Sequence, residues 1–157
     1  MNEKTLAEWI QDNLSASIVE FARPVTGRMF LRIQANSILY VTRLLKEKAG
    51  ITHLCTITGL DLGENFELLY HFAYETGCLT LRFTVPKALP NTPSICSCIP
   101  GAILYERELQ DMFGLVFENL PDSRRLLLPE DWPAGAFPLR KDWKFERTPE
   151  VIPGGEQ

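Results

Sequence analysis

A dense group of carboxylates occupies the second half of the chain, at Glu106, Glu108 and Asp111. Paired carboxylates act as general acid and base in many hydrolases, so a small hydrolase is one function that this group would suit. No histidine or other nucleophile stands nearby in the sequence. Charged helix faces are common, and Arg107 lies at i, i+4 from Asp111. We therefore interpret the carboxylates as an interface face that pairs with Arg107 and with arginines of a partner.

The cysteines and histidines could together form a metal site. Cys96 and Cys98 flank one residue, and His53 and Cys55 would share one face of a strand, which makes four potential ligands. Zinc and Fe–S sites usually use a C-x₂-C spacing, which is missing here, so we expect reduced, structural cysteines. His71 lies within an apolar strand pattern and is expected to be a structural histidine.

The elements that would position these groups begin with a body of helices and strands. Apolar residues at helical spacing predict two helices, and runs rich in Ile, Val, Phe and Thr predict five strands. The expected order is α-β-β-α-β-β-β, over residues 5–14, 17–22, 29–33, 36–50, 51–60, 66–74 and 78–85. The last strand alternates apolar and polar side chains, as a sheet with one exposed face does. We predict an α+β fold, a two-layer sandwich with a mixed sheet.

The second part of the chain differs in composition. Ten of the 11 prolines lie from Pro86 onward, and residues 105–157 carry 7 basic and 11 acidic side chains, against 9 of each in residues 1–104. We predict a body at 1–86, an extended proline-rich arm at 87–148 with a short helix near 101–113, and a disordered tail at 149–157. Tyr105, Leu109 and Phe113 share a helical face, and Gly114 would end that helix.

Charge and hydropathy exclude several classes of function. The 157-residue chain has a net charge of -4, a pI of about 5.2 and no basic block, which argues against nucleic-acid binding. No apolar run reaches the roughly 18–20 residues of a membrane span, so membrane contact would be indirect. The first residues match neither a signal peptide nor a transit peptide, and we expect the protein to stay where it is made.

Three motifs follow one another in the second part. They read Tyr-Glu-Arg-Glu-Leu-Gln-Asp-Met-Phe-Gly at 105–114, Asp-Ser-Arg-Arg-Leu-Leu-Leu-Pro-Glu-Asp-Trp at 122–132 and Pro-Leu-Arg-Lys-Asp-Trp at 138–143. With the order of the body elements, they resemble the 30 kDa subunit of respiratory complex I, known in bacteria as the C subunit. The relatives of this family in membrane-bound, complex-I-like NiFe hydrogenases share the resemblance.

The resemblance implies a subunit with no catalytic residue and no cofactor or metal of its own. It implies a place in the peripheral arm of a complex-I-like NADH:quinone oxidoreductase, on the cytoplasmic side of the cell membrane. The partners would be the large, 49 kDa-type subunit that houses the quinone site and the small Fe–S subunit. NADH, flavin, Fe–S clusters and quinone, or a NiFe centre in a hydrogenase, would belong to partner subunits. The sequence leaves open which parent complex applies.

Carried onto this sequence, the motifs assign a partner interface. The expected residues are Tyr105, Glu106, Arg107, Glu108, Asp111, Phe113, Gly114, Arg124, Arg125, Leu128, Trp132, Pro138, Leu139, Arg140, Lys141 and Asp142. The basic residues would meet acids of the partner, and the leucines and tryptophans would fill apolar pockets. The arm would order fully only on binding.

Two other interpretations of the arm stay open. Trp132 and Trp143 could stack on a ring cofactor instead of anchoring in a partner. The chain could also be a free-standing adaptor that binds an acidic or amphipathic peptide through the arm. Such an adaptor would occur in cells without a large oxidoreductase subunit.

Overall fold

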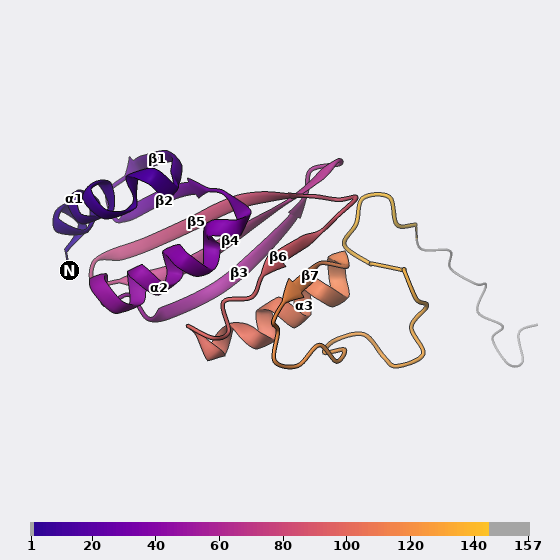
Figure 1. Ribbon diagram of the computed structural model, residues 1–157. Coiled ribbons are helices and arrows are strands. Elements are labelled where there is room, and N and C mark those ends of the chain that lie inside the picture. The colour runs from indigo at the N-terminus through magenta and orange to yellow at the C-terminus, as the bar shows by residue number, and fades with distance from the viewer. Residues whose placement is uncertain (1, 145–157) are drawn as a thin grey trace, which may run out of the picture.

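A five-stranded sheet forms the centre of the protein in the computed structural model, which describes residues 2–144 (Figure 1). The strands are β1 (Ile18–Val25), β2 (Arg28–Ile33), β3 (His53–Asp61), β4 (Asn65–Tyr74) and β5 (Gly77–Pro86). Their order in the sheet is β1-β2-β5-β4-β3, with β2 and β5 parallel and the other pairs antiparallel. The sheet is therefore mixed, and the predicted α+β fold is confirmed.

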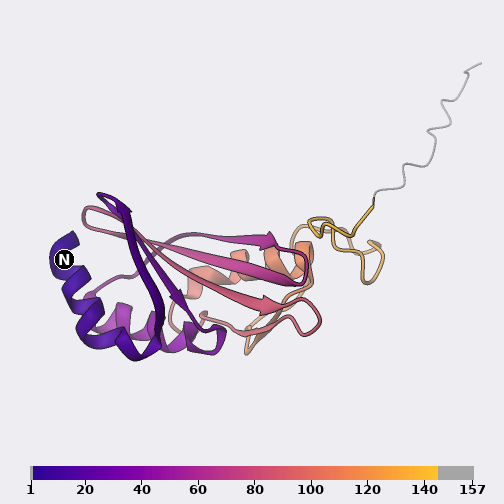
Figure 2. The same cartoon turned by 90° about the horizontal axis from the view of Figure 1, so that it is seen from above.

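Helices cover one face of this sheet (Figure 2). Helix α1 (Glu3–Leu14) begins at Asn2, whose side chain accepts the Thr5 N–H at 3.0 Å, and α2 (Ile38–Ala49) ends at Gly50 with a positive φ of 70°. Short 3₁₀ turns at Ser15–Ser17 and Ala35–Ser37 join these helices to the strands. All seven predicted elements are present within a few residues of their expected bounds.

The core lies between the helices and the sheet, where the apolar side chains of alternate strand positions point. Apolar side chains from α1, α2 and strands β2 to β5 form it, and the largest are Leu6, Ile10, Leu14, Met29, Leu31, Ile38, Leu45, Phe66, Leu68, Tyr70, Phe72 and Phe83. The period-2 alternation of β4 and β5 places every second side chain in this core.

The same core includes residues beyond the predicted boundary at 86. A two-stranded parallel sheet joins β6 (Asn91–Pro93) to β7 (Val116–Glu118), and between them lies α3 (Ile103–Phe113), which follows a 3₁₀ turn at Pro100–Ala102. Ile95, Leu109 and Phe117 are buried in the core cluster. Residues 91–118 therefore pack as part of the body, and the extended connector expected at 87–100 contains a strand and buried side chains.

Residues 119–144 form neither helix nor strand, and we call them the C-terminal loop. Figure 1 shows this loop at the end of the molecule where α3 and the tip of the β3–β4 hairpin lie. The predicted tail at 149–157 is outside the described residues. Within residues 2–144, no helix has the length and apolar character needed to span a bilayer.

Candidate docking surface formed by helix α3 and the C-terminal loop

Helix α3 is seated on the sheet by a glycine at each contact. A Cβ at Gly59 of β3 would lie 2.7 Å from the Leu109 side chain and 2.8 Å from the Phe113 ring, so only glycine allows this close approach. Gly114 ends the helix with φ 70°, and a Cβ there would lie 2.5 Å from the Phe137 ring. Gly114 therefore lets the C-terminal loop return against the end of α3.

Glu106 is fully buried inside the chain, although its charged neighbours in the sequence predicted an interface face. Its carboxylate accepts hydrogen bonds from the Ser94 hydroxyl at 2.6 Å, the Ile95 N–H at 2.9 Å and the Cys96 thiol at 3.3 Å. Burial raises the pKa of Glu106, and these hydrogen bonds partly oppose the increase. A carboxyl group with no access to solvent cannot reach a substrate, so its raised pKa does not support the hydrolase interpretation.

Arg107 and Asp111 hold the C-terminal loop by its backbone. The Arg107 guanidinium donates to the carbonyl oxygens of Arg124 at 2.8 Å and Arg125 at 2.9 Å, and it lies 3.3 Å from the Asp122 carboxylate. One oxygen of Asp111 accepts the N–H groups of residues 126, 127 and 128 at 2.8, 2.8 and 3.2 Å. The expected pairing of Arg107 with Asp111 is wrong, because each side chain binds a different part of the loop.

A second anchor holds the far end of the loop at Asp61, which the sequence pattern placed in a turn without any further role. Its carboxylate accepts the Lys141 N–H at 2.8 Å, the Lys87 ammonium at 2.9 Å and the Gly63 N–H at 2.7 Å. Burial alone would raise the pKa of Asp61, but these donors outweigh it and lower the pKa to about 2. Lys87 also lies 3.1 Å from Asp142, which links the loop to the end of β5.

Arg140 packs within its own chain instead of pointing freely toward a partner. Its Nε donates to the Phe113 carbonyl at 2.7 Å, and its guanidinium lies 4.3 Å from the Phe137 ring centre and 5.2 Å from that of Phe66. Next to it, the Leu139 N–H donates to the Met112 carbonyl at 3.1 Å. The loop is therefore fixed at residues 124–128 and again at 139–142.

The outer surface of the loop carries charged and apolar side chains. Arg124 is 85% exposed while it ion-pairs with Asp122 at 2.7 Å, and its hydrogen bond holds the pKa of Asp122 well below the usual range. Leu127 and Leu139 are 56% and 54% exposed. Arg125, Lys141 and Asp142 are also exposed. Exposed leucines beside exposed charges are the composition of a docking surface rather than of a hydrated loop.

The two tryptophans of the loop lie beside each other. The ring centres of Trp132 and Trp143 are 6.0 Å apart, and the Trp132 indole donates to the Ala136 carbonyl at 2.9 Å. Trp132 also lines a hollow of about 250 Å³ between the loop and Asp111, along with Leu128 and Phe137. This hollow is small for a ring cofactor, because small-molecule sites usually span about 300–1,000 Å³.

The remaining predicted interface residues have different environments. The Tyr105 hydroxyl donates to the Cys55 carbonyl at 3.0 Å, Phe113 is buried, Leu128 and Pro138 are half-buried, and Glu108 is exposed on α3. The structure thus brings the predicted residues together around α3 and the loop. It divides them into an inner set that holds the loop and an outer set that faces solvent.

The cysteines and histidines have structural environments in the described chain. Cys96 and Cys98 are buried, whereas Cys55 is exposed. Burial raises the pKa of the Cys96 thiol to about 11. No group of three or more His, Cys, Asp or Glu side chains within residues 2–144 is arranged to hold a metal ion. His71 is hydrogen-bonded to Thr80 at 2.9 Å, as expected for a structural histidine.

Comparison with known proteins gives one family over most of the chain. Residues 31–149 match the family described as the respiratory-chain NADH dehydrogenase, 30 Kd subunit. The chain is 30% identical over 148 residues to the C subunit of F(420)H(2) dehydrogenase from Methanosarcina mazei, covering 92% of this chain and 93% of that protein. It is 34% identical over 131 residues to formate hydrogenlyase subunit 5 of Escherichia coli, covering 80% of this chain but only 23% of that protein.

A solved structure has the same fold. It is a chain of the membrane-bound sulfane sulfur reductase, an archaeal respiratory membrane complex, with a TM-score of 0.80 at 23% identity. The match covers 90% of this chain and 85% of the other. At this identity, the likeness concerns the arrangement of the elements, including the sheet and α3.

Proposed function

The chain belongs to the family of the 30 kDa subunit of respiratory-chain NADH dehydrogenase, and from this premise we propose that it is a non-catalytic structural subunit. It occupies the peripheral arm of a complex-I-like, energy-converting oxidoreductase. Its relatives are subunits of complexes whose names describe different reactions, including F420H2 dehydrogenase and formate hydrogenlyase. One fold shared among different electron donors favours a common positional role over a role in any one reaction.

The observation that carries the proposal is the two-sided construction of the C-terminal loop. Arg107, Asp111 and Asp61 hold the loop largely through its backbone atoms, which leaves the side chains of Arg124 and Leu127 outward. A loop held in this way presents charge and apolar surface in a fixed geometry, which lowers the entropy cost of binding. The loop docks on the large subunit that houses the quinone site, beside the small Fe–S subunit.

The redox groups belong to the partners in this proposal. NADH and flavin, Fe–S clusters and quinone reside in other subunits, and this chain supports electron transfer by holding those subunits in position. Its contact with the membrane is indirect, through the complex, on the cytoplasmic side. The similarity to formate hydrogenlyase subunit 5 favours one second candidate, the equivalent subunit of a membrane-bound NiFe hydrogenase complex.

Co-purification tests the docking surface. The double variant Arg124→Ala and Arg125→Ala is expected to reduce the yield of the large subunit at least about tenfold, because exposed arginines are frequent binding hot spots. The matched control is Arg43→Ala, which removes an exposed arginine from α2, away from the loop. Full retention of the large subunit by the double variant would contradict this docking surface.

The composition of the purified complex tests the parent complex. A flavin-containing subunit among the co-purifying chains indicates oxidation of NADH, whereas nickel in the large subunit indicates a hydrogenase. Purification of the chain without any large oxidoreductase subunit would overturn the structural-subunit proposal and favour the free-standing adaptor.

A further inference from the structure

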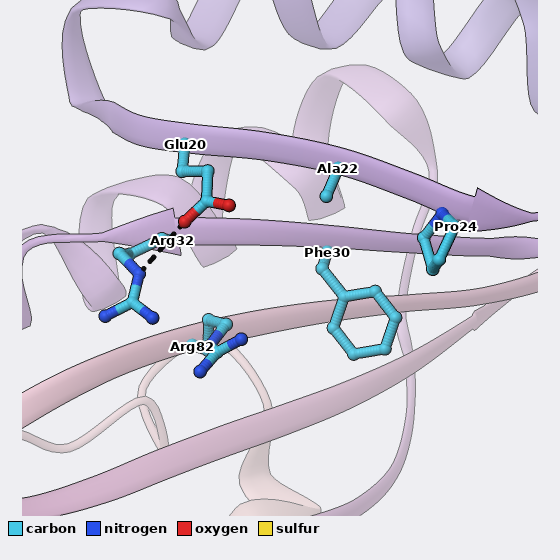
Figure 3. Close-up of a pocket in the computed structure, with 6 residues that line it drawn as sticks. All are labelled: Glu20, Ala22, Pro24, Phe30, Arg32 and Arg82. Carbon is cyan, nitrogen blue, oxygen red and sulfur yellow. Dashed lines mark hydrogen bonds and ion pairs between the residues drawn. The ribbon is translucent and has the colours of Figure 1, made fainter.

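The face of the sheet opposite the helices is open, and it contains a hollow. Figure 2 shows the helices on one side only, and Figure 3 shows the hollow on the open side. The hollow has a volume of about 250 Å³ and lies where β1, β2 and β5 adjoin. Its lining residues are Glu20, Ala22, Pro24, Phe30, Arg32 and Arg82. The nearest strand edge is β1, at the opposite side of the sheet from β3 and α3.

One end of the hollow carries two arginines in direct register. Arg32 of β2 and Arg82 of β5 are cross-strand partners, so two like charges lie side by side and need counter-charges. Glu67, whose side chain is only 8% exposed, binds Arg82 through two nitrogens at 2.9 and 2.5 Å but lies 3.9 Å from Arg32. Arg82 is therefore firmly paired inside the protein, and Arg32 is not.

The remaining counter-charge of Arg32 is weakly held. Glu20 approaches Arg32 at 3.3 Å, and its side chain is 63% exposed. An exposed ion pair of this kind contributes only about 0–1 kcal/mol, so a carboxylate from another molecule can replace Glu20 at little cost. The guanidinium of Arg32 also offers bidentate geometry for a carboxylate.

The other end of the hollow is apolar. Phe30, Ala22 and Pro24 line it, and Figure 3 shows the Phe30 ring beside the two arginines. A volume of about 250 Å³ is below the roughly 300–1,000 Å³ of small-molecule sites, and it suits one large side chain. An apolar floor next to a replaceable positive charge fits an apolar side chain with an acidic neighbour.

We propose that this hollow is a second docking site, which binds a partner-protein segment carrying a large apolar side chain next to an Asp or Glu. The apolar side chain packs on Phe30, and the carboxylate takes Arg32 from Glu20. The inference rests on the proposed function, since it assigns a second contact to a subunit already held in a complex. The two contacts would lie at opposite edges of the sheet, and the chain would bridge two parts of its assembly.

Site-specific photo-cross-linking in the intact complex tests this site. A benzophenone amino acid replaces Thr84, an exposed position on the open face two residues from Arg82. A second sample carries the same group at Leu127 on the C-terminal loop. Mass spectrometry then identifies the cross-linked peptides. We expect the Thr84 sample to label a peptide of another subunit that contains an apolar residue beside Asp or Glu.

Substitutions within the hollow supply the specificity. In the Thr84 sample, Ala22→Trp fills the hollow and Arg32→Glu reverses its charge, and each is expected to lower the cross-link yield at least about tenfold. Val19→Trp is the matched control, because Val19 is exposed on the same strand but does not line the hollow. This control should change the yield by less than about twofold.

The outcomes separate the two proposals. A cross-link from Leu127 but none from Thr84 overturns the second docking site and leaves the proposed function standing. No cross-link to another subunit from either position overturns both. A Thr84 cross-link to a second copy of this chain, or to a peptide without an acidic residue, overturns the stated occupant. A cross-link that persists with Arg32→Glu overturns the role of that arginine.

Discussion

Asp111→Ala tests the anchoring of the C-terminal loop most directly. The single carboxylate oxygen of Asp111 accepts three N–H groups, from residues 126, 127 and 128. A hydrogen bond to a charged acceptor contributes about 1.5–3 kcal/mol net. Because the N–H groups of a surface loop regain water once released, we expect the loss to resemble one such bond rather than three, about 2–3 kcal/mol of local stability.

Amide hydrogen exchange measures this change. A loss of about 2–3 kcal/mol corresponds to roughly 30- to 150-fold faster exchange, since each 1.4 kcal/mol is a factor of ten. The acceleration should be confined to residues 122–132, and amides of strands β4 and β5 should keep their protection. Glu108→Ala is the matched control, because it removes an exposed carboxylate from the same helix.

The result that refutes the reasoning is equally specific. If exchange at residues 126–128 changes by less than about threefold in Asp111→Ala, the carboxylate does not hold the loop. If exchange rises equally in β4 and β5, Asp111 stabilises the whole fold instead of the loop. If Glu108→Ala gives the same acceleration, the effect comes from net charge rather than from the hydrogen bonds.

Three further variants test the glycine contact and the two buried carboxyls. Gly114→Ala combines a positive φ with a Cβ 2.5 Å from an aromatic ring, and we expect it to lower the free energy of unfolding by more than about 1 kcal/mol in thermal melting. Gly101→Ala has open space and should leave the melting temperature nearly unchanged. Burial raises the pKa of Glu106, so its contribution to stability is complete below its ordinary pKa of 4.5 and is lost as pH rises through the folded value. Glu106→Gln should remove this decline in urea unfolding measured from pH 4 to 8, and an unchanged slope would contradict the assignment. Asp61 has the opposite sign, because burial, which raises its pKa, is outweighed by donors that lower it to about 2. Its contribution is present above its ordinary pKa of 3.8 and is lost as pH falls through about 2, so an NMR titration midpoint near 4 would argue against the anchor.

The body could be predicted from sequence because local patterns determine its elements. Strand β5 alternates apolar and polar side chains, and α2 has a helical apolar face ended by Gly50. The parallel pairing of β2 with β5 was not visible, because nothing in either strand specifies a partner 50 residues away. The prolines at 86, 90, 93 and 100 suggested an extended connector, but tertiary packing places Ile95 in the core instead.

The anchors of the loop depend on contacts that no local pattern encodes. Asp61 meets Lys141 across 80 positions of the sequence, and the turn at Gly59 and Gly63 gave no sign of it. Glu106 seemed to belong to a charged helix face, yet it points to the segment at 94–96 and is buried there. A glutamate directly after the apolar face residue Tyr105 was the only signal that the carboxylate could turn inward.

The order of the anchors along the chain has a consequence for biosynthesis. Asp61, Arg107 and Asp111 all precede the loop that they hold, and β5, the strand that joins the two halves of the sheet, ends at Pro86. A ribosome therefore releases a complete sheet and its helix α3 before the last loop residues emerge, because chains fold from the N-terminus as they are made. The surface that we assign to the large subunit is the last to form, so a nascent chain cannot engage that partner before its own body is complete.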